Sequence, residues 1–170
     1  MKKTIYKIGL FSGIVGFVMS VSTIVALASE PLPKQSYLPQ EMAQKAAATA
    51  LKMCKNDGYA VSVTVVDSSG IVKVVLRGDG AGPHTLGSSS GKAYTAASMK
   101  RATMGLANFI KDKPELSGLR NMDDRILILG GGLPINIGGQ FVGGIGVGGA
   151  PGGHLDEACA KAGIKAITSH

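Results

Sequence analysis

The sequence predicts one domain of mixed α/β class (α+β), in which helices flank a single antiparallel sheet of about five strands. Two observations lead to this class. Helix-like and strand-like segments occur in the order helix, two strands, helix, three strands, helix, without the regular strand-helix alternation of a doubly wound parallel sheet. The first two strand-like segments are joined by a short Ser-Ser-Gly turn, which connects antiparallel strands.

The N-terminal half of the domain contains two predicted helices and a predicted hairpin. Small and apolar residues at intervals of three and four predict a helix over 40–56, and Gly58 stands where that helix would end. β-branched residues predict the strands of the hairpin over 59–67 and 71–77. An Ala-rich stretch predicts the second helix over 88–104.

The C-terminal half contains three predicted short strands. Mixed charge, a proline and the lack of a sustained period predict a long irregular connection over 109–124. The strands that follow are separated by glycine-rich turns and cover residues 125–129, 133–137 and 141–147. A last helix is predicted over 156–162, because a glycine follows it directly.

Residues 1–28 have the layout of a secretory signal peptide. Lysines at the start precede an uncharged run over 8–28 that ends in Ala-Leu-Ala. We therefore expect cleavage after Ala28 and a periplasmic or secreted bacterial protein, with a linker over 29–38 and one domain over 39–170. The alternative is an uncleaved membrane anchor, because the uncharged run is long enough to span a bilayer.

The chain is basic, with 18 Lys and Arg against 11 Asp and Glu and a formal net charge of +7. Part of this charge belongs to the signal peptide, which removes the main support for nucleic-acid binding. Residues 80–111 contain no Asp or Glu. They place Lys92, Lys100 and Arg101 on the second helix, where an anionic ligand could bind. A solvated helix face would show the same charge pattern.

Alternating glycines mark the last predicted strand. Residues 144–149 satisfy the G-x-G-x-x-G pattern of dinucleotide-binding loops, but only 21 residues follow, too few for the rest of that unit. Gly144, Gly146 and Gly148 instead leave one face of the strand without side chains. Such a face permits close approach by a helix of the same chain, a second subunit or a flat ligand, and we expect a homo-oligomer.

Two histidines are candidate ligands or general bases. His84 lies in a Gly- and Pro-containing loop directly before the basic helix, and His154 lies at the start of the last helix. Neither belongs to a zinc-binding His-x-x-x-His pair, and the chain has no Gly-x-Ser-x-Gly elbow. Zinc hydrolysis and serine hydrolysis therefore have no support from the sequence.

Two cysteines, Cys54 and Cys159, complete the set of reactive side chains. They lie 105 residues apart and lack the spacing of a metal site or a redox motif. Export would permit a disulfide between them, because disulfides persist in oxidising compartments. We expect two buried thiols rather than a bridge.

Seven segments distributed over residues 40–167 resemble one family when they are taken together and in order. They begin at Glu41 (EMAQKAAA), Val66 (VDSSG), Asp79 (DGAGPHTL), Lys92 (KAYTA), Gly130 (GGGLPI), Val142 (VGGIGVG) and Asp156 (DEACAKAG). The chain resembles the GlcG/HbpS-like haem-binding family. This resemblance implies a profilin-like fold with a five-stranded antiparallel sheet, assembly into a homo-oligomer, and haem held near a subunit interface.

The resemblance also implies a function, and haem as the ligand gives expected roles to the donor and basic residues already described. An exported protein for haem sensing, storage or buffering is expected, with a possible sensor partner protein and no stable membrane anchor after cleavage. His84 is the expected axial ligand of the haem iron and His154 the alternative, while Thr85 and Tyr94 are further oxygen donors. The haem propionates are expected to meet the basic side chains Lys92, Lys100 and Arg101.

Two other classes of function stay open at this point. An enzyme of the same fold could degrade haem or act on a hydroxy acid, with His84 or His154 as its general base. No nucleophile or second catalytic acid is recognisable, so no catalytic residue is assigned. A structural oligomer would use the glycines for packing alone.

Overall fold

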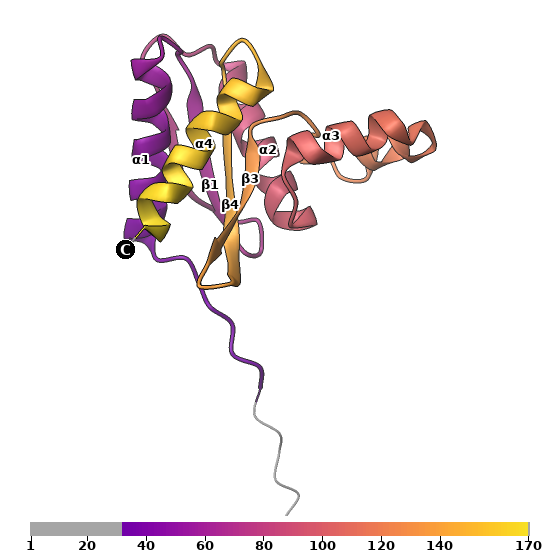
Figure 1. The fold of residues 1–170 in the computed structure, drawn as a ribbon, viewed down its shortest axis with the longest axis horizontal. Helices are drawn as coiled ribbons and strands as arrows, with labels where there is room; N and C mark the ends of the chain where they lie inside the picture. Colours follow the sequence, from indigo (N-terminus) through magenta and orange to yellow (C-terminus); the bar gives the residue numbers. More distant parts are fainter. Residues whose placement is uncertain (1–31, 170) are drawn as a thin grey trace, which may run out of the picture. The chain divides into compact units, whose positions relative to one another are not determined.

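Four antiparallel strands form the centre of the structure, a computed structural model that describes residues 32–169. Their bounds are β1 (Ser62–Asp67), β2 (Val72–Arg77), β3 (Gly132–Ile137) and β4 (Gln140–Gly148). They are hydrogen-bonded in the order β2-β1-β4-β3. Figure 1 shows β1, β4 and β3 beside the helices. The predicted hairpin is confirmed as β1 and β2, although β1 begins three residues later than expected. The described sheet has four strands, so the prediction of five is wrong.

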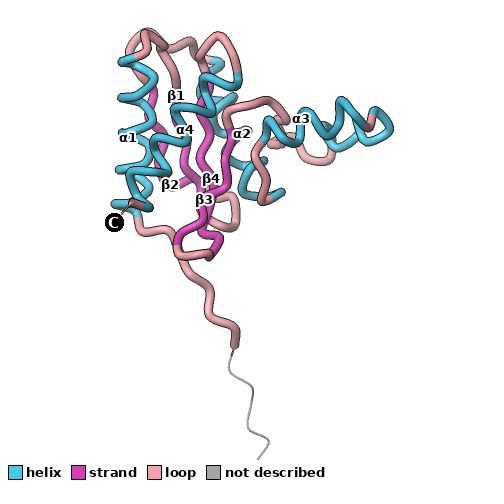
Figure 2. The backbone as a smooth tube through the Cα atoms, viewed as in Figure 1, coloured by secondary structure: helices cyan, strands magenta, loops and turns pink. Residues whose placement is uncertain are grey.

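Helices cover both faces of the sheet (Figure 2). α1 (Gln40–Asn56) and α4 (Gly153–Thr168) lie side by side on one face, and α2 (His84–Met99) lies on the other. The main core lies between the sheet and the α1–α4 pair. It contains fully buried strand side chains, among them Val63, Val65, Ile145 and Val147. The predicted α/β fold with helices flanking an antiparallel sheet is therefore confirmed.

The predicted irregular connection over 109–124 is wrong. α3 (Thr103–Asp112) and the short 3-10 helix η1 (Pro114–Asn121) occupy this part of the chain. Leu106 and Ile110 lie one helical turn apart on α3, and both are buried in a small second hydrophobic core. Burial of these two side chains in the second core stabilises the helix, and the mixed charge of the sequence does not indicate this burial.

The predicted strand over 125–129 is also wrong, because these residues pair with no strand in the described structure. Ile126 and Ile128 are buried while Leu127 between them is partly exposed, which is the alternation that a strand would show. Both isoleucines belong to the second hydrophobic core. The N–H of Leu127 donates to the hydroxyl of Thr95 at 2.7 Å, so a side chain replaces the strand partner.

α2 and α4 have different bounds from those predicted. The second helix was expected over 88–104, but α2 ends at Met99 because Lys100 adopts a φ of 49° in the left-handed region. A lysine is an unusual residue for that conformation, so the end of the helix at this position was not predicted. α4 extends beyond the predicted 156–162 at both ends.

The backbone of α2 covers the glycine face of β4. A Cβ added to Gly144 would lie 2.6 Å from the carbonyl oxygen of Ala93 in α2, and one added to Gly146 would overlap the carbonyl oxygen of Ser89. Of the three expected occupants of this face, the helix of the same chain is therefore the correct one. The face is closed to a second subunit and to a flat ligand, so the homo-oligomer stays a prediction that loses this support.

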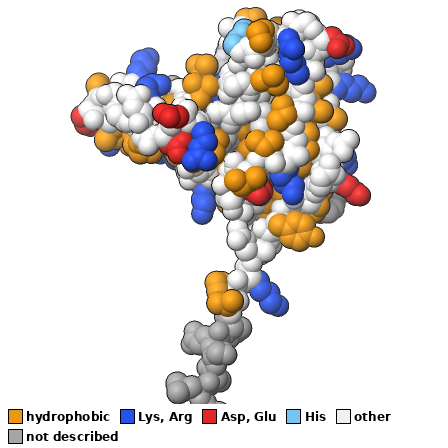
Figure 3. All heavy atoms as spheres, turned by 180° about the vertical axis from the view of Figure 1, so that it is seen from behind, with side chains coloured by type: hydrophobic (Ala, Val, Ile, Leu, Met, Phe, Trp, Pro, Cys, Tyr) orange, Lys and Arg blue, Asp and Glu red, His pale blue; other side chains and the backbone are white. Residues whose placement is uncertain are grey.

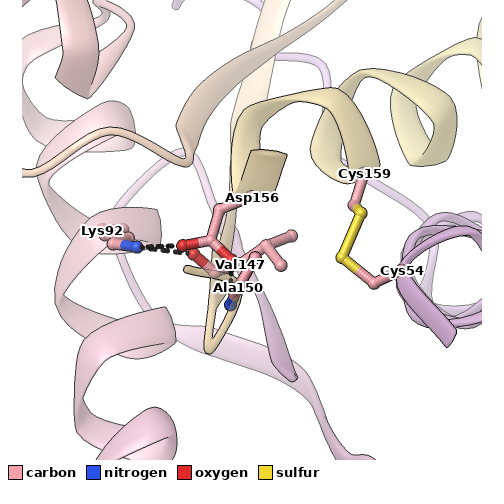
Figure 4. Close-up of a disulfide and its surroundings, with 6 residues drawn as sticks. All are labelled: Cys54, Lys92, Val147, Ala150, Asp156 and Cys159. Carbon is pink, nitrogen blue, oxygen red and sulfur yellow. Dashed lines mark hydrogen bonds and ion pairs between the residues drawn. A yellow bond between two sulfur atoms is a disulfide. The ribbon is translucent and has the colours of Figure 1, made fainter. Parts of the chain in front are cut away.

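Cys54 and Cys159 form a disulfide, which corrects the expectation of two buried thiols. α1 and α4 carry the two residues and lie side by side, so the Cα atoms are only 5.6 Å apart, within the range that a disulfide bridges. Figure 4 shows the bond between α1 and α4. Both cysteines are fully buried. The long sequence separation gave no sign that the two cysteines meet, because the packing of α1 against α4 brings them together.

Residues 1–31 and 170 lie outside the described residues. The predicted signal peptide over 1–28 falls there, together with the first part of the linker. Within residues 32–169, none of the helices combines the length and the apolar character needed to cross a membrane. The boundaries of the signal peptide, the linker and the domain therefore stay predictions.

Candidate functional site

An open hollow of about 440 Å³ lies beside α2. Three parts of the chain line it: the β1–β2 connection, the outer side of α2, and residues 124–127. Its lining residues are Val66, Gly70, Val72, Gly87, Ser90, Gly91, Tyr94, Asp124, Arg125, Ile126 and Leu127. Figure 3 shows the molecule from the side opposite to Figure 1, where hydrophobic side chains reach the surface between basic ones. The hollow combines apolar walls with a few polar groups, as small-molecule sites do.

Small residues of α2 keep the floor of the hollow open. Gly87, Ser90, Gly91 and Tyr94 follow one another at helical spacing, so they share one side of the helix. A Cβ added to Gly87 would meet no heavy atom within 4 Å. One added to Gly91 would lie 2.9 Å from the Cβ of Leu127, so this glycine lets the 124–127 segment approach the helix.

Tyr94 and Arg125 form the polar end of the hollow. The Arg125 guanidinium lies 4.1 Å from the centroid of the Tyr94 ring, a stacking contact. On another side of the ring lies Gly70, where an added Cβ would be 2.8 Å from Cδ2 of Tyr94. The positive φ of Gly70, 79°, is also one that glycine tolerates best. The turn and the arginine together fix the position of the aromatic ring.

Asp123 holds Arg125 in this position. The Nε and Nη2 atoms of Arg125 donate to the two carboxylate oxygens of Asp123 at 2.9 and 2.7 Å. This two-point pairing lowers the pKa of Asp123 well below its usual range, because the hydrogen bonds favour the ionised carboxylate. The same pairing raises the pKa of Arg125. The Tyr94 hydroxyl donates to Asp123 over a longer distance of 3.4 Å.

The predicted donors at the start of α2 lie outside the hollow. His84 is the first residue of α2 and is exposed, with its ring folded back over Gly82. Thr85 is buried, and its hydroxyl lies 2.7 Å from that of Ser62 and donates to the carbonyl of Gly82 at 2.6 Å. The Thr85 oxygen is therefore committed to hydrogen bonds within the fold.

Lys92 is buried in an ion pair. Its ammonium donates to Asp156 Oδ2 at 2.7 Å and to the carbonyl of Val147 at 2.9 Å (Figure 4). The other oxygen of Asp156 accepts the N–H of Ala150 at 3.0 Å. Since Lys92 is only 1% exposed, its charge faces the interior and joins α2 to α4. In this arrangement the ammonium does not reach a surface ligand.

The remaining predicted residues lie at the ends of helices. Lys100 and Arg101 follow α2, with their charges over the rings of Phe141 and Phe109 at 5.2 and 5.3 Å. They are separated from His84 by the length of α2, roughly 24 Å at 1.5 Å per residue.

His154 is exposed near the start of α4. Of all the predicted site residues, Tyr94 is the one that lines the hollow.

The sequence did not indicate the wall formed by residues 124–127, or Asp123 beside it. The spacing of Asp123 and Arg125, two residues apart, was visible but common, and the segment was assigned to an irregular connection and a strand. Within the described residues, no group of three His, Cys, Asp or Glu side chains is placed to hold a metal ion. The polar chemistry of the hollow therefore depends on Tyr94, Ser90, Asp124 and Arg125.

The fold and the hollow define a small α/β protein with an antiparallel sheet between helices and a site open to a small molecule. The chain belongs to the HbpS-like family, because the family model described as "Haem degrading protein HbpS-like" matches residues 38–165. The recognised GlcG/HbpS-like resemblance is thereby confirmed. The profilin-like description of the fold stays a prediction.

Three known proteins illustrate the similarity. A crystal structure of a double mutant of HbpS from Streptomyces reticuli is 42% identical, with a TM-score of 0.75 over 86% of this chain and 97% of that one. The structure of a PduOC:heme complex is 26% identical, with a TM-score of 0.72 over 78% of this chain and 96% of that one. Protein GlcG of Escherichia coli K12 is 30% identical over 117 residues, which cover 65% of this chain and 80% of GlcG.

Proposed function

We propose that this protein binds haem in the hollow beside α2. The observation that carries the proposal is an apolar hollow with a floor of small residues, closed at one end by an aromatic oxygen donor and an arginine. Membership of the HbpS-like family and similarity to the protein of the PduOC:heme complex support haem as the ligand. Bound haem would supply an iron centre for electron transfer or for binding a further ligand.

The residues of the hollow fit what a porphyrin needs. Val66, Val72 and Ile126 provide apolar walls, and the open space above Gly87 admits a flat ring. Tyr94 is an oxygen donor, and the Arg125 side chain is 60% exposed at the rim, where a carboxylate of the ligand could meet it. Haem in this position would lie at the surface, which is compatible with the expected position near a subunit interface.

We further propose that the protein works outside the cytoplasm, where it senses, stores or buffers haem. The predicted signal peptide motivates this location, and the fully buried disulfide supports it, because disulfides form and persist in oxidising compartments. Intact-mass measurement of periplasmic or secreted protein should give a chain that begins at Ser29. Recovery of the full-length chain in the membrane fraction would contradict cleavage.

A homo-oligomer is part of the same proposal. The exposed hydrophobic side chains Val72 and Val75 on β2, with Leu86 on α2, offer apolar surface that a second subunit could cover. Light scattering on the mature protein at micromolar concentration tests the assembly. A monomer under these conditions would remove the interfacial location of the site without removing haem binding.

A haem titration with a matched pair of variants tests the function. Gly87→Phe places a ring in the open part of the hollow, where an added Cβ meets nothing within 4 Å, and should weaken haem binding by roughly tenfold or more, a change of about 1.4 kcal/mol or more. Gly105→Phe is the control, because Gly105 is also a helical glycine with free space, in α3 outside the hollow. Equal binding by both variants would place the haem elsewhere.

Haem degradation is the second candidate function, favoured by the description of the family. The same titration distinguishes it from storage once a reductant is added. Steady decay of the Soret band in the presence of the protein, faster than for haem alone, would support degradation. A stable band would support binding for sensing, storage or buffering.

A further inference from the structure

We propose that the phenol oxygen of Tyr94 binds the haem iron, in place of the imidazole of His84. This inference rests on the proposed function, because it requires haem in the hollow beside α2. The chain offers several oxygen and nitrogen donors near α2, and their positions in the structure distinguish between them.

The lining of the hollow contains few side chains that can ligate iron. Besides Tyr94, the donors are the Ser90 hydroxyl and the Asp124 carboxylate. The Ser90 hydroxyl lies 3.2 Å from that of Thr64 and is directed to a hydrogen bond with the sheet. Tyrosine, in contrast to serine and aspartate, is an established type of axial haem ligand. His84 begins α2 but is not among the residues that line the hollow.

The surroundings of Tyr94 hold its ring while leaving its oxygen weakly bound. Gly70 and the guanidinium of Arg125 both contact the ring, so the side chain has little freedom to turn away. The hydroxyl has one hydrogen bond, to Asp123 at the long distance of 3.4 Å. A ligand atom that is fixed in position but poorly satisfied can be transferred to iron at low cost.

Arg125 is a positioning residue in this arrangement. It is locked by two short hydrogen bonds to Asp123, and it stacks on the ring that carries the proposed ligand atom. Arg125→Ala should therefore broaden or shift the haem spectrum by loosening the ring, while a Tyr94-ligated spectrum remains recognisable. Arg125→Lys keeps the charge but loses the two-point pairing, so it should resemble Arg125→Ala rather than the parent protein.

Absorption and electron paramagnetic resonance spectra of the ferric haem complex test the ligand directly. Tyr94→Phe should abolish the tyrosinate-to-iron charge-transfer band and weaken binding by roughly tenfold or more. Tyr37→Phe makes the same chemical change at an exposed residue outside the hollow and should leave the spectrum unchanged. His84→Ala should also leave it unchanged. Circular dichroism establishes that each variant is folded.

A gain of a new spectrum provides a second test. Tyr94→His should bind haem with the spectrum of an imidazole-ligated iron, because the ring would occupy the same clamped position. A parent-like spectrum in Tyr94→Phe and Tyr94→His would overturn the proposal while haem binding stands. Loss of the spectrum in His84→Ala would assign the ligand to His84. Failure of the parent protein to bind haem would overturn the proposed function itself.

Discussion

Lys92 and Asp156 form the most deeply buried ion pair in the described structure. Both side chains are almost fully buried, and all partners of the ammonium and the carboxylate come from the protein. Removing one partner leaves the other charge buried without compensation. Lys92→Met should therefore lower the free energy of unfolding by about 3–5 kcal/mol, measured by urea denaturation.

An exposed lysine provides the control for this substitution. Lys161 pairs with Glu157 one turn earlier on α4, and its side chain is 66% exposed. Lys161→Met should cost only about 0.3–0.5 kcal/mol, because water screens such a pair. Similar losses of unfolding free energy in the two variants would mean that water reaches the Lys92 ammonium in the folded protein.

The buried pair also explains Gly131, which the sequence placed only in a glycine-rich turn. A Cβ added to Gly131 would lie 2.6 Å from the Cβ of Asp156 and 3.1 Å from the ammonium nitrogen of Lys92. The residue has a φ of 116°, which side chains rarely adopt. Gly131 thus makes room for the ion pair, a role that follows from contacts between distant segments and not from its neighbours in the sequence.

The Asp123 carboxyl, beside the hollow, should lose its proton at a lower pH than an ordinary aspartate. Its pKa is lowered from the ordinary 3.8 because Arg125 donates hydrogen bonds to the ionised carboxylate. The stability that this pairing contributes is present above the unfolded pKa and is lost as the pH falls through the lower folded pKa. In a nuclear magnetic resonance titration, the Asp123 carboxyl should change below pH 3.8.

The variant Arg125→Ala gives the matching measurement. Without the guanidinium, the titration midpoint of Asp123 should move up towards the ordinary value of 3.8. An unchanged midpoint would show that the hydrogen bonds from Arg125 do not persist in solution, and the position of the Tyr94 ring would then need another cause.

At the scale of elements, α2 covers one face of the sheet by packing closely on β4. The two backbones approach because β4 presents glycine where most strands present side chains. Gly146→Ala should push the helix from the strand and lower stability by about 1–3 kcal/mol or more, measured as a shift in thermal unfolding. Gly118→Ala is the control, because an added Cβ there meets nothing within 4 Å. A neutral Gly146→Ala would mean that α2 can shift without cost.

Elements with a local signal were predictable from the sequence. The spacing of Met42, Ala46, Ala50 and Cys54 predicted α1 with the bounds that it has, and the Ser-Ser-Gly turn predicted the β1–β2 hairpin. Ile126 and Ile128 misled the prediction, because alternating burial arises in any extended segment that lies over a core, with or without a neighbouring strand. Lys100 misled it in another way, because lysine rarely adopts the left-handed conformation that ends α2 there.

At the scale of the whole molecule, the site was less predictable than the fold. The hollow joins residues near 70, 90 and 125, and a single sequence does not show that these stretches meet. Tyr94 was among the candidates because it lies on the basic helix, whereas Arg125 was not considered. The set that joined His84 to Lys100 and Arg101 ignored the length of the helix between them.

The disulfide gives a prediction for the whole molecule. It links helices near the two ends of the domain, so it restricts the unfolded chain over a long loop. The double variant Cys54→Ala with Cys159→Ala should lose about 2–5 kcal/mol of unfolding free energy by chemical denaturation. Mild reductant should leave the folded parent intact, because both sulfur-bearing residues are fully buried. Rapid reduction under native conditions would show that α1 and α4 separate easily.

The same bond turns residues 54–159 into a closed covalent ring. Exposed chain inside the ring, such as the end of α3 from Lys111 to Lys113, is a site where proteases can cut. A single cut there would yield two pieces that remain tied through α1 and α4, so the protein would migrate as one species on a non-reducing gel and as two after reduction. In the exported protein that we propose, a severed chain would keep its two halves together.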